Sequence, residues 1–123
     1  DELVICSKRS KFTSGDMVAV YYNNKNLLKR VIGIEGDIID IKEDGTVYVN
    51  GTELDESYVN EKSLGICDIK LPYQVPDNRI FVMGDNRSVS VDSRSTTVGC
   101  IADEYVIGRV IFRLWPFKNI GTV

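Results

Sequence analysis

One lysine of the sequence lies between apolar residues in a segment with the alternation of a strand. In an extended chain Leu27, Lys29 and Val31 share one face, because successive side chains point to opposite faces. Such a lysine is either exposed at a sheet edge or buried beside its apolar neighbours. Burial disfavours the ammonium form and lowers the pKa of the amine, and a neutral lysine can act as a general base. Lys29 is therefore the first candidate for a catalytic residue.

A second concentration of reactive groups lies at residues 84–94, directly after an apolar run. These eleven residues include two Asp, two Arg, three Ser and one Asn. Such a composition is typical of a solvated loop. It also fits a polar shell around a buried base, because Asp can hold Arg in bidentate pairs and a serine hydroxyl can orient a nearby amine.

The absence of histidine narrows the chemistry that this sequence can perform. It excludes the Ser-His-Asp triad, the Cys-His dyad and the HExxH zinc site. The three cysteines, Cys6, Cys67 and Cys100, show no CxxC spacing and cannot close an ordinary zinc finger without histidine. We expect them to be buried as small apolar groups or, for two of them, to form a disulfide. We expect no metal and no cofactor.

Charge and glycine spacing argue against nucleic acids and nucleotides as partners. The formal net charge of −3 provides no overall attraction for a polyanion. Gly33 and Gly36 lie in a block that fits neither of the common phosphate-binding loop patterns. A tight turn between two strands is the better interpretation of this block, because glycine tolerates positive φ.

The elements that must position these residues are strands. Val, Ile and Thr are abundant, and the apolar clusters are short and separated by turn residues. Asn23-Asn24 and Asn50-Gly51 predict hairpins, and residues 60–77, which show no period, predict an irregular excursion. We expect residues 1–123 to form a single, mostly antiparallel all-β domain. Its longest apolar runs are far shorter than the ~20 residues that a membrane helix needs.

Several blocks of the sequence, taken in order along the chain, resemble the type I signal peptidases. Together they cover nearly the whole chain, and their combination is far more specific than any single dipeptide. The short distance between the lysine block and the Gly-Asp-Asn block is similar to that in the compact enzymes of Gram-positive bacteria. The blocks are Ser14–Val20, Lys29–Asp37, Tyr48–Gly51, Val75–Arg94, Gly108-Arg109 and Trp115-Pro116.

The resemblance implies roles for the candidate residues. Lys29 would be the general base of a Ser/Lys dyad, and Ser90 would provide the hydroxyl that orients its amine. A supporting polar shell would consist of Arg30, Asp85, Asp92 and Arg94, with Asp85 and Arg30 as a pair. An extended substrate would add as a strand beside the backbone of Asn26, Leu27 and Leu28.

The resemblance also implies an activity and a location. Type I signal peptidases are serine endopeptidases that remove signal peptides from exported preproteins after small-x-small sites such as Ala-x-Ala. This chain would then be a hydrolase on the extracytoplasmic side of the cell membrane, held there by an N-terminal anchor. The implied fold is all-β, with coiled sheets or a partly open barrel, which agrees with the strand pattern.

One block of the family pattern has no counterpart in the sequence. The family's nucleophilic serine belongs to a Ser-Met-x-Pro-Thr-like block, and no serine here has that context. We expect this serine and the anchor to lie upstream of Asp1. Residues 1–123 alone should then be inactive, because much of the oxyanion hole would be missing as well. An edge left open by the missing strand would offer a route to dimerisation.

Two other interpretations compete with a truncated signal peptidase. A natural relative without the serine would bind extended peptides or a secretion partner without cutting them. A retained Lys29 with apolar neighbours argues against this, since burying an amine is costly. A self-cleaving repressor domain would share the Ser/Lys chemistry, but no DNA-binding segment or internal cleavage strand is recognisable. We therefore favour the truncated peptidase.

Overall fold

The computed structural model describes residues 3–7 and 11–114. This part of the chain forms ten strands and one short 3-10 turn, so the predicted all-β class is confirmed. Every strand pair is antiparallel. The elements are β1 (Leu3–Ser7), β2 (Met17–Tyr22), β3 (Lys25–Ile34), β4 (Ile38–Ile41), β5 (Val47–Val49), β6 (Thr52–Glu53), β7 (Tyr73–Gln74), β8 (Arg79–Met83), β9 (Ile101–Ala102), the 3-10 turn η1 (Asp103–Tyr105) and β10 (Val106–Leu114).

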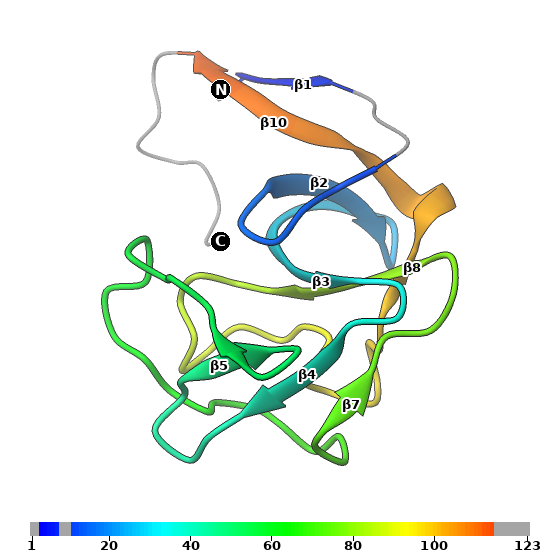
Figure 1. Cartoon of the computed structure of the whole chain (residues 1–123). Coiled ribbons are helices and arrows are strands. Elements are labelled where there is room, and N and C mark those ends of the chain that lie inside the picture. The colour runs from blue at the N-terminus through cyan, green and yellow to red at the C-terminus, as the bar shows by residue number, and fades with distance from the viewer. Residues whose placement is uncertain (1–2, 8–10, 115–123) are drawn as a thin grey trace.

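The strands form two sheets (Figure 1). The larger sheet has the order β1-β10-β2-β3-β8-β9, and the smaller sheet has the order β6-β5-β4-β7. Both orders are linear, so neither sheet closes on itself over the described residues. The chain leaves the larger sheet at the end of β3 and enters β4 through a turn in which Gly36 has a φ of 84°. This is the tight turn that the glycine spacing predicts.

Two of the hairpin turns are formed by residues that accept a left-handed backbone. Asn23 and Asn24, between β2 and β3, have φ values of 52° and 61°. Asn50 and Gly51, between β5 and β6, have φ values of 53° and 83°. Two successive residues with positive φ give the turn whose twist matches that of paired strands. Both predicted hairpins are therefore confirmed.

Strand β3 is paired differently along its length. Residues 25–30 pair with β2, whereas residues 30–34 pair with β8. Among the residues that the structure describes, positions 25–29 therefore have a strand on one side only. We call this stretch the open edge of β3. Lys29 lies at its inner end.

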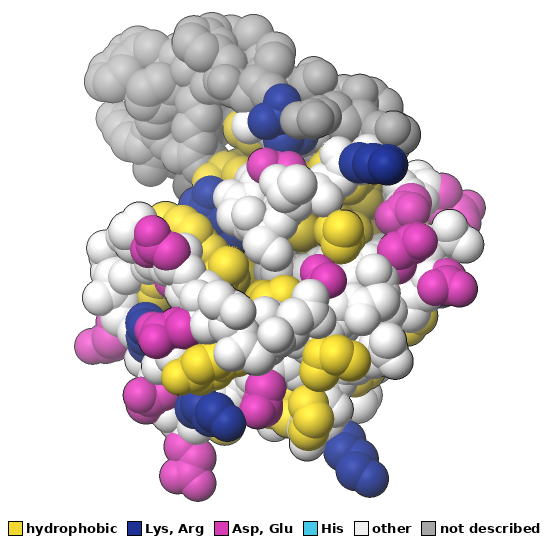
Figure 2. Space-filling view, in the orientation of Figure 1, with side chains coloured by type: hydrophobic (Ala, Val, Ile, Leu, Met, Phe, Trp, Pro, Cys, Tyr) yellow, Lys and Arg dark blue, Asp and Glu magenta, His cyan; other side chains and the backbone are white. Residues whose placement is uncertain are grey.

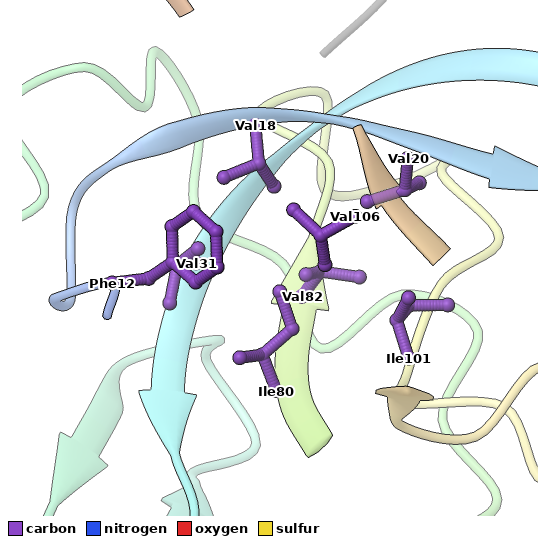
Figure 3. Close-up of a cluster of buried hydrophobic side chains, with 8 residues drawn as sticks. All are labelled: Phe12, Val18, Val20, Val31, Ile80, Val82, Ile101 and Val106. Atoms are coloured by element: carbon purple, nitrogen blue, oxygen red, sulfur yellow. The ribbon is translucent and has the colours of Figure 1, made fainter. Parts of the chain in front are cut away.

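Two clusters of buried apolar side chains fill the interior, and β3 and β8 separate them. Val31 and Val82 enter the first cluster, whereas their neighbours Ile32 and Phe81 enter the second, as expected from strand alternation. The first cluster (Figure 3) comprises Phe12, Val18, Val20, Val31, Ile80, Val82, Ile101 and Val106. The second, beside the smaller sheet, comprises Ile32, Ile39, Ile41, Val47, Val75, Phe81, Met83 and Cys100.

The surface is mixed in character. On the face shown in Figure 2, acidic and basic side chains are interspersed, with exposed apolar side chains between them. Val89 and Val91, on either side of Ser90, are 60% and 50% exposed. The described residues contain no helical segment with the length and apolarity of a membrane span.

Gly45 offers a test of how closely the segment after β6 packs on the smaller sheet. Gly45 has a φ of 93°, and a Cβ at this position would overlap the backbone of Ser63. Gly51 has a φ of 83° but open space around it. Alanine at either position adopts a left-handed backbone, which costs about 1–2 kcal/mol. We expect Gly45→Ala to reduce the free energy of unfolding in urea by at least about 1 kcal/mol more than Gly51→Ala. Equal losses would contradict the close packing.

Candidate active site

Lys29 lies on the face of β3 that contributes Leu27 and Val31 to the first apolar cluster, as the alternation predicts. It pairs with Val18 of β2, and only 9% of the residue is exposed. Its Nζ atom donates a hydrogen bond to Ser90 Oγ at 2.8 Å. Burial lowers the pKa of the Lys29 amine below its ordinary value of 10.5, and this effect outweighs the opposing attraction of Asp92.

Ser90 reaches Lys29 because the loop after β8, residues 84–95, folds back on itself. We call this segment the Ser90 loop. The backbone N–H of Gly84, at its start, donates to the Asp92 carboxylate at 2.9 Å. The backbone N–H of Ser90 donates to the Asn86 carbonyl at 3.0 Å, and the Ser93 hydroxyl accepts from the Val82 N–H at 2.9 Å. These contacts hold the loop beside the end of β8.

Asp92 and Arg94 form a fully buried ion pair within the Ser90 loop. Arg94 Nε and Nη2 each donate to a different oxygen of Asp92 at 2.9 Å, and neither side chain is exposed. Arg94 Nη2 also donates to the Ser90 carbonyl at 3.3 Å. The pair therefore fixes the backbone that carries the serine, and bidentate geometry of this kind is strongly directional.

Arg30 and Asp85 form the ion pair that the resemblance implies, and they lie on the other face of β3. Arg30 Nη2 and Nε donate to the two oxygens of Asp85 at 2.6 and 3.2 Å. Arg30 Nη1 donates to the Gly15 carbonyl at 3.1 Å, and its guanidinium stacks 4.0 Å from the centre of the Tyr58 ring. The structure thus brings Lys29, Ser90, Asp92 and Arg94 together. Arg30 and Asp85 lie on the opposite face of β3.

The residues expected to bind substrate lie along the open edge of β3. Asn26 is exposed, and Leu27 and Leu28 are half-buried. A cavity of about 10 Å³ lies beside Lys29, room for little more than one small group. It is lined by Val20, Tyr22, Leu27, Lys29, Val82, Val91, Asp92, Val98 and Ile101. An extended chain beside this edge would meet a small, largely apolar cavity next to the amine.

Three buried or half-buried polar residues near the site were not predicted from the sequence. Arg87 donates to both carboxylate oxygens of Glu56, at 3.0 and 2.5 Å, and neither side chain is exposed. The Tyr58 hydroxyl donates to Glu56 at 3.3 Å, and burial together with the Glu56 charge raises the pKa of Tyr58 to about 12. Arg87 belongs to the polar block at residues 84–94, but Glu56 and Tyr58, between the Asn50-Gly51 turn and the irregular residues 60–77, carry no sequence signal.

The cysteines and acidic residues provide no further reactive centre that can be described. Cys67 is half-buried and Cys100 is buried, and both are free thiols. Burial raises the pKa of each thiol, which disfavours the nucleophilic thiolate. The side chain of Cys6 and the block Trp115-Pro116 lie outside the described part of the chain. Among the described residues, no group of three His, Cys, Asp or Glu could hold a metal ion.

An all-β scaffold with a buried lysine hydrogen-bonded to a serine is consistent with a hydrolase that uses an amine base. The family model described as signal peptidase, peptidase S26, matches residues 1–115 of this chain. The chain belongs to the signal peptidase family. The resemblance drawn from the sequence blocks is therefore confirmed.

Individual relatives agree with this assignment. Signal peptidase IB of Staphylococcus aureus is 40% identical over 119 residues, covering 83% of this chain and 61% of the relative. Signal peptidase I of Bacillus licheniformis is 39% identical over 119 residues, covering 89% and 63%. A signal peptidase I from Enterococcus faecalis matches in structure with a TM-score of 0.68 and 28% identity, covering 85% of this chain and 100% of that one. The chain spans about three fifths of the length of the Staphylococcus and Bacillus relatives.

The burial of Lys29 predicts a pH dependence of stability. The unfolded chain holds the Lys29 proton up to its ordinary pKa of 10.5, whereas the folded protein releases it at lower pH. Between these two values the unfolded state binds more protons, so the free energy of unfolding rises with pH. Lys29→Met removes this contribution. As pH rises through this window, we expect the free energy of unfolding to increase more for the parent than for Lys29→Met.

The measurement is the free energy of unfolding in urea at several pH values, with Lys42→Met as the matched control. Lys42, with 57% of its side chain exposed, controls for the loss of a lysine at the surface. Equal slopes for the parent and Lys29→Met would show that Lys29 has an ordinary pKa.

The buried Asp92–Arg94 pair predicts a large loss of stability when one partner is removed. Asp92→Ala leaves a buried guanidinium without its counter-charge, which typically costs about 3–5 kcal/mol. The exposed pair of Glu53 and Lys62, with side chains 55% and 39% exposed, is the control. We expect Glu53→Ala to change the free energy of unfolding by less than about 1 kcal/mol. Similar melting temperatures for Asp92→Ala and the parent would refute this account of the pair.

Proposed function

We propose that this chain forms the catalytic β domain of a type I signal peptidase, a serine endopeptidase with a lysine general base. The observation that carries the proposal is the Lys29–Ser90 contact, 2.8 Å between Nζ and Oγ at a lysine that is only 9% exposed. Burial lowers the pKa of this lysine and so favours the neutral amine that a general base requires. Residues 1–123 contain no histidine that could perform the same task.

In the proposed mechanism Lys29 first accepts a proton and then donates it. Its neutral amine accepts the proton of the nucleophilic serine as that oxygen attacks the scissile carbonyl carbon. The resulting ammonium then donates this proton to the departing amine when the peptide bond breaks. Lys29 then accepts a proton from the water that attacks the acyl-enzyme, and it returns this proton to the serine oxygen as the ester bond breaks. Ser90 accepts a hydrogen bond from Nζ and thereby directs the amine.

We place the nucleophile outside residues 1–123. Ser90 is the described serine whose hydroxyl contacts Lys29, and it lacks the residue context of the family's nucleophile. Much of the oxyanion hole would come from the neighbourhood of the missing serine. Residues 1–123 alone should therefore not cleave a peptide.

We further propose that the substrates are signal peptides of exported preproteins, bound as an added strand along the open edge of β3. Strand addition recognises backbone, and the small cavity beside Lys29 favours small side chains near the scissile bond. The proposed location is the cell membrane, with this domain on the extracytoplasmic side and an anchor outside these residues. Pairing of two copies through an exposed edge stays a prediction.

The proposal predicts that cleavage depends on Lys29 as a base. In the complete gene product, Lys29→Ala and Lys29→Arg should both abolish cleavage of a peptide with an Ala-x-Ala site. Arginine fails because a guanidinium does not deprotonate. The rate for the parent should rise with pH through the lowered pKa of Lys29. Mass spectrometry of the products measures the rate and the cleavage site.

Lys42→Ala, at an exposed lysine, is the control and should cleave like the parent. Ser90→Ala should retain part of the activity, since Ser90 only directs the amine; complete loss would contradict this limited role. Cleavage by Lys29→Arg, or a rate that is flat with pH, would refute the lysine base. Peptide binding without cleavage by the complete product would favour a serine-less relative.

A further inference from the structure

The segment between β6 and β7, residues 54–72, contains no strand, yet it is tightly joined to the Ser90 loop. We call this segment the strap. Its contacts with the loop centre on two guanidinium groups that are fully buried, those of Arg87 and Arg94. Ser90 lies between these two arginines in the sequence. The strap therefore contacts the loop on both sides of the residue that meets Lys29.

The contact on the first side is the ion pair between Glu56 and Arg87. Both side chains are fully buried, and Arg87 donates to both oxygens of the carboxylate. The third guanidinium nitrogen, Nε, donates to the Gly84 carbonyl at 2.7 Å. Arg87 thus ties the strap to the point where the Ser90 loop leaves β8, and Glu56 supplies its counter-charge.

The contact on the second side involves Arg94 and backbone groups of the strap. Arg94 Nη1 donates to the Leu64 carbonyl at 2.7 Å, and the Asp68 N–H donates to the Arg94 carbonyl at 3.0 Å. A Cβ at Gly65 would overlap the Arg87 carbonyl oxygen, so the two segments lie in direct contact. The strap covers the loop closely enough that a shift of one segment must shift the other.

We propose that Glu56 is a positioning residue for the Lys29 base. By holding Arg87 in a bidentate pair, it fixes the Ser90 loop and so keeps the Ser90 hydroxyl on the Lys29 amine. This inference rests on the proposed function, in which Lys29 is the base. Glu56 itself contacts Arg87 and Tyr58 and acts on the amine through the loop.

A role of Glu56 in stability can be distinguished from a role in orienting the Ser90 loop. A buried ion pair is in itself weak evidence that the pair stabilises the fold. Replacing such a pair by apolar side chains of similar volume is often neutral or stabilising, whereas removing one partner is harmful. The apolar pair lacks the direction that two parallel hydrogen bonds provide. A double substitution can therefore restore stability without restoring the orientation of the loop.

The test compares Glu56→Gln, Arg87→Met and the double variant Glu56→Leu/Arg87→Met in the complete gene product. We expect each single variant to lose stability and to lower kcat for an Ala-x-Ala peptide by about 100-fold, as small misplacements at a site do. KM should change much less than kcat, because the open edge of β3 is not altered. The double variant should regain the melting temperature of the parent but not its kcat.

A second readout follows the Lys29 amine itself and does not require cleavage. The charged groups that face Lys29 are Asp92 and Arg94 from the Ser90 loop, and Tyr22 of β2 lines the adjoining cavity. None of them is changed in these variants. A loosened loop admits water to the amine and raises its pKa toward the ordinary value. The pH dependence of Lys29 acetylation by acetic anhydride, followed by mass spectrometry, measures this shift on residues 1–123 as well.

Glu53→Gln is the matched control, because it removes an exposed ion pair with Lys62 of the strap. It should leave kcat, the melting temperature and the Lys29 acetylation profile unchanged. Recovery of both stability and kcat in the double variant would overturn the proposal, as would an unshifted Lys29 profile in Glu56→Gln and in the double variant.

The proposed function fails in a different way. If the parent Lys29 titrates like an ordinary lysine, or if Lys29→Ala still cleaves, the lysine base is wrong whatever the Glu56 variants do. If the parent behaves as proposed and the Glu56 and double variants match it, the positioning role alone is wrong.

Discussion

The arrangement of this domain around its candidate site depends on the burial of one amine. An ammonium group in an apolar interior is costly, so the folded protein favours the neutral form of Lys29. The Asp92 charge raises the pKa of Lys29, and the Arg94 charge lowers it, so the two members of this ion pair have opposite effects on the amine. If Asp92 lacked its arginine, its charge would act on the lysine unopposed. The tight Asp92–Arg94 pair therefore opposes the neutral form of the lysine less than a lone carboxylate would.

The Ser90 loop contacts side chains on both faces of β3. Lys29 and Arg30 are neighbours in sequence and so point to opposite faces of the strand. The Ser90 loop contacts both, because Asp85 at its start binds Arg30 and Ser90 further on binds Lys29. The loop thus passes from one face of the strand to the other. Its position relative to β3 is set by contacts on both faces, and one of these contacts is the serine hydroxyl that meets the amine.

The sequence predicts the local elements of this site better than the contacts between them. The hairpin at Asn23-Asn24 follows from two residues that tolerate positive φ, and the face of Lys29 follows from simple alternation. The pair of Arg30 with Asp85 was expected only through resemblance to a family, because 55 residues separate the partners. Glu56 was missed altogether. A glutamate that belongs to no motif is expected to be exposed, and only its partner Arg87, 31 residues away, explains its burial.

An open strand edge is usually a liability, because unpaired backbone groups can pair with another chain. Over the described residues, β3 nevertheless leaves positions 25–29 without a partner on one side, next to the buried amine. The polar residues Lys25 and Asn26 at its outer end are exposed, which discourages indiscriminate pairing. Toward Lys29 the edge borders a small apolar cavity, so a peptide that pairs there must also present a small side chain. Under the proposed function, selectivity would then arise from size at the cavity, while the backbone pairing accepts many sequences.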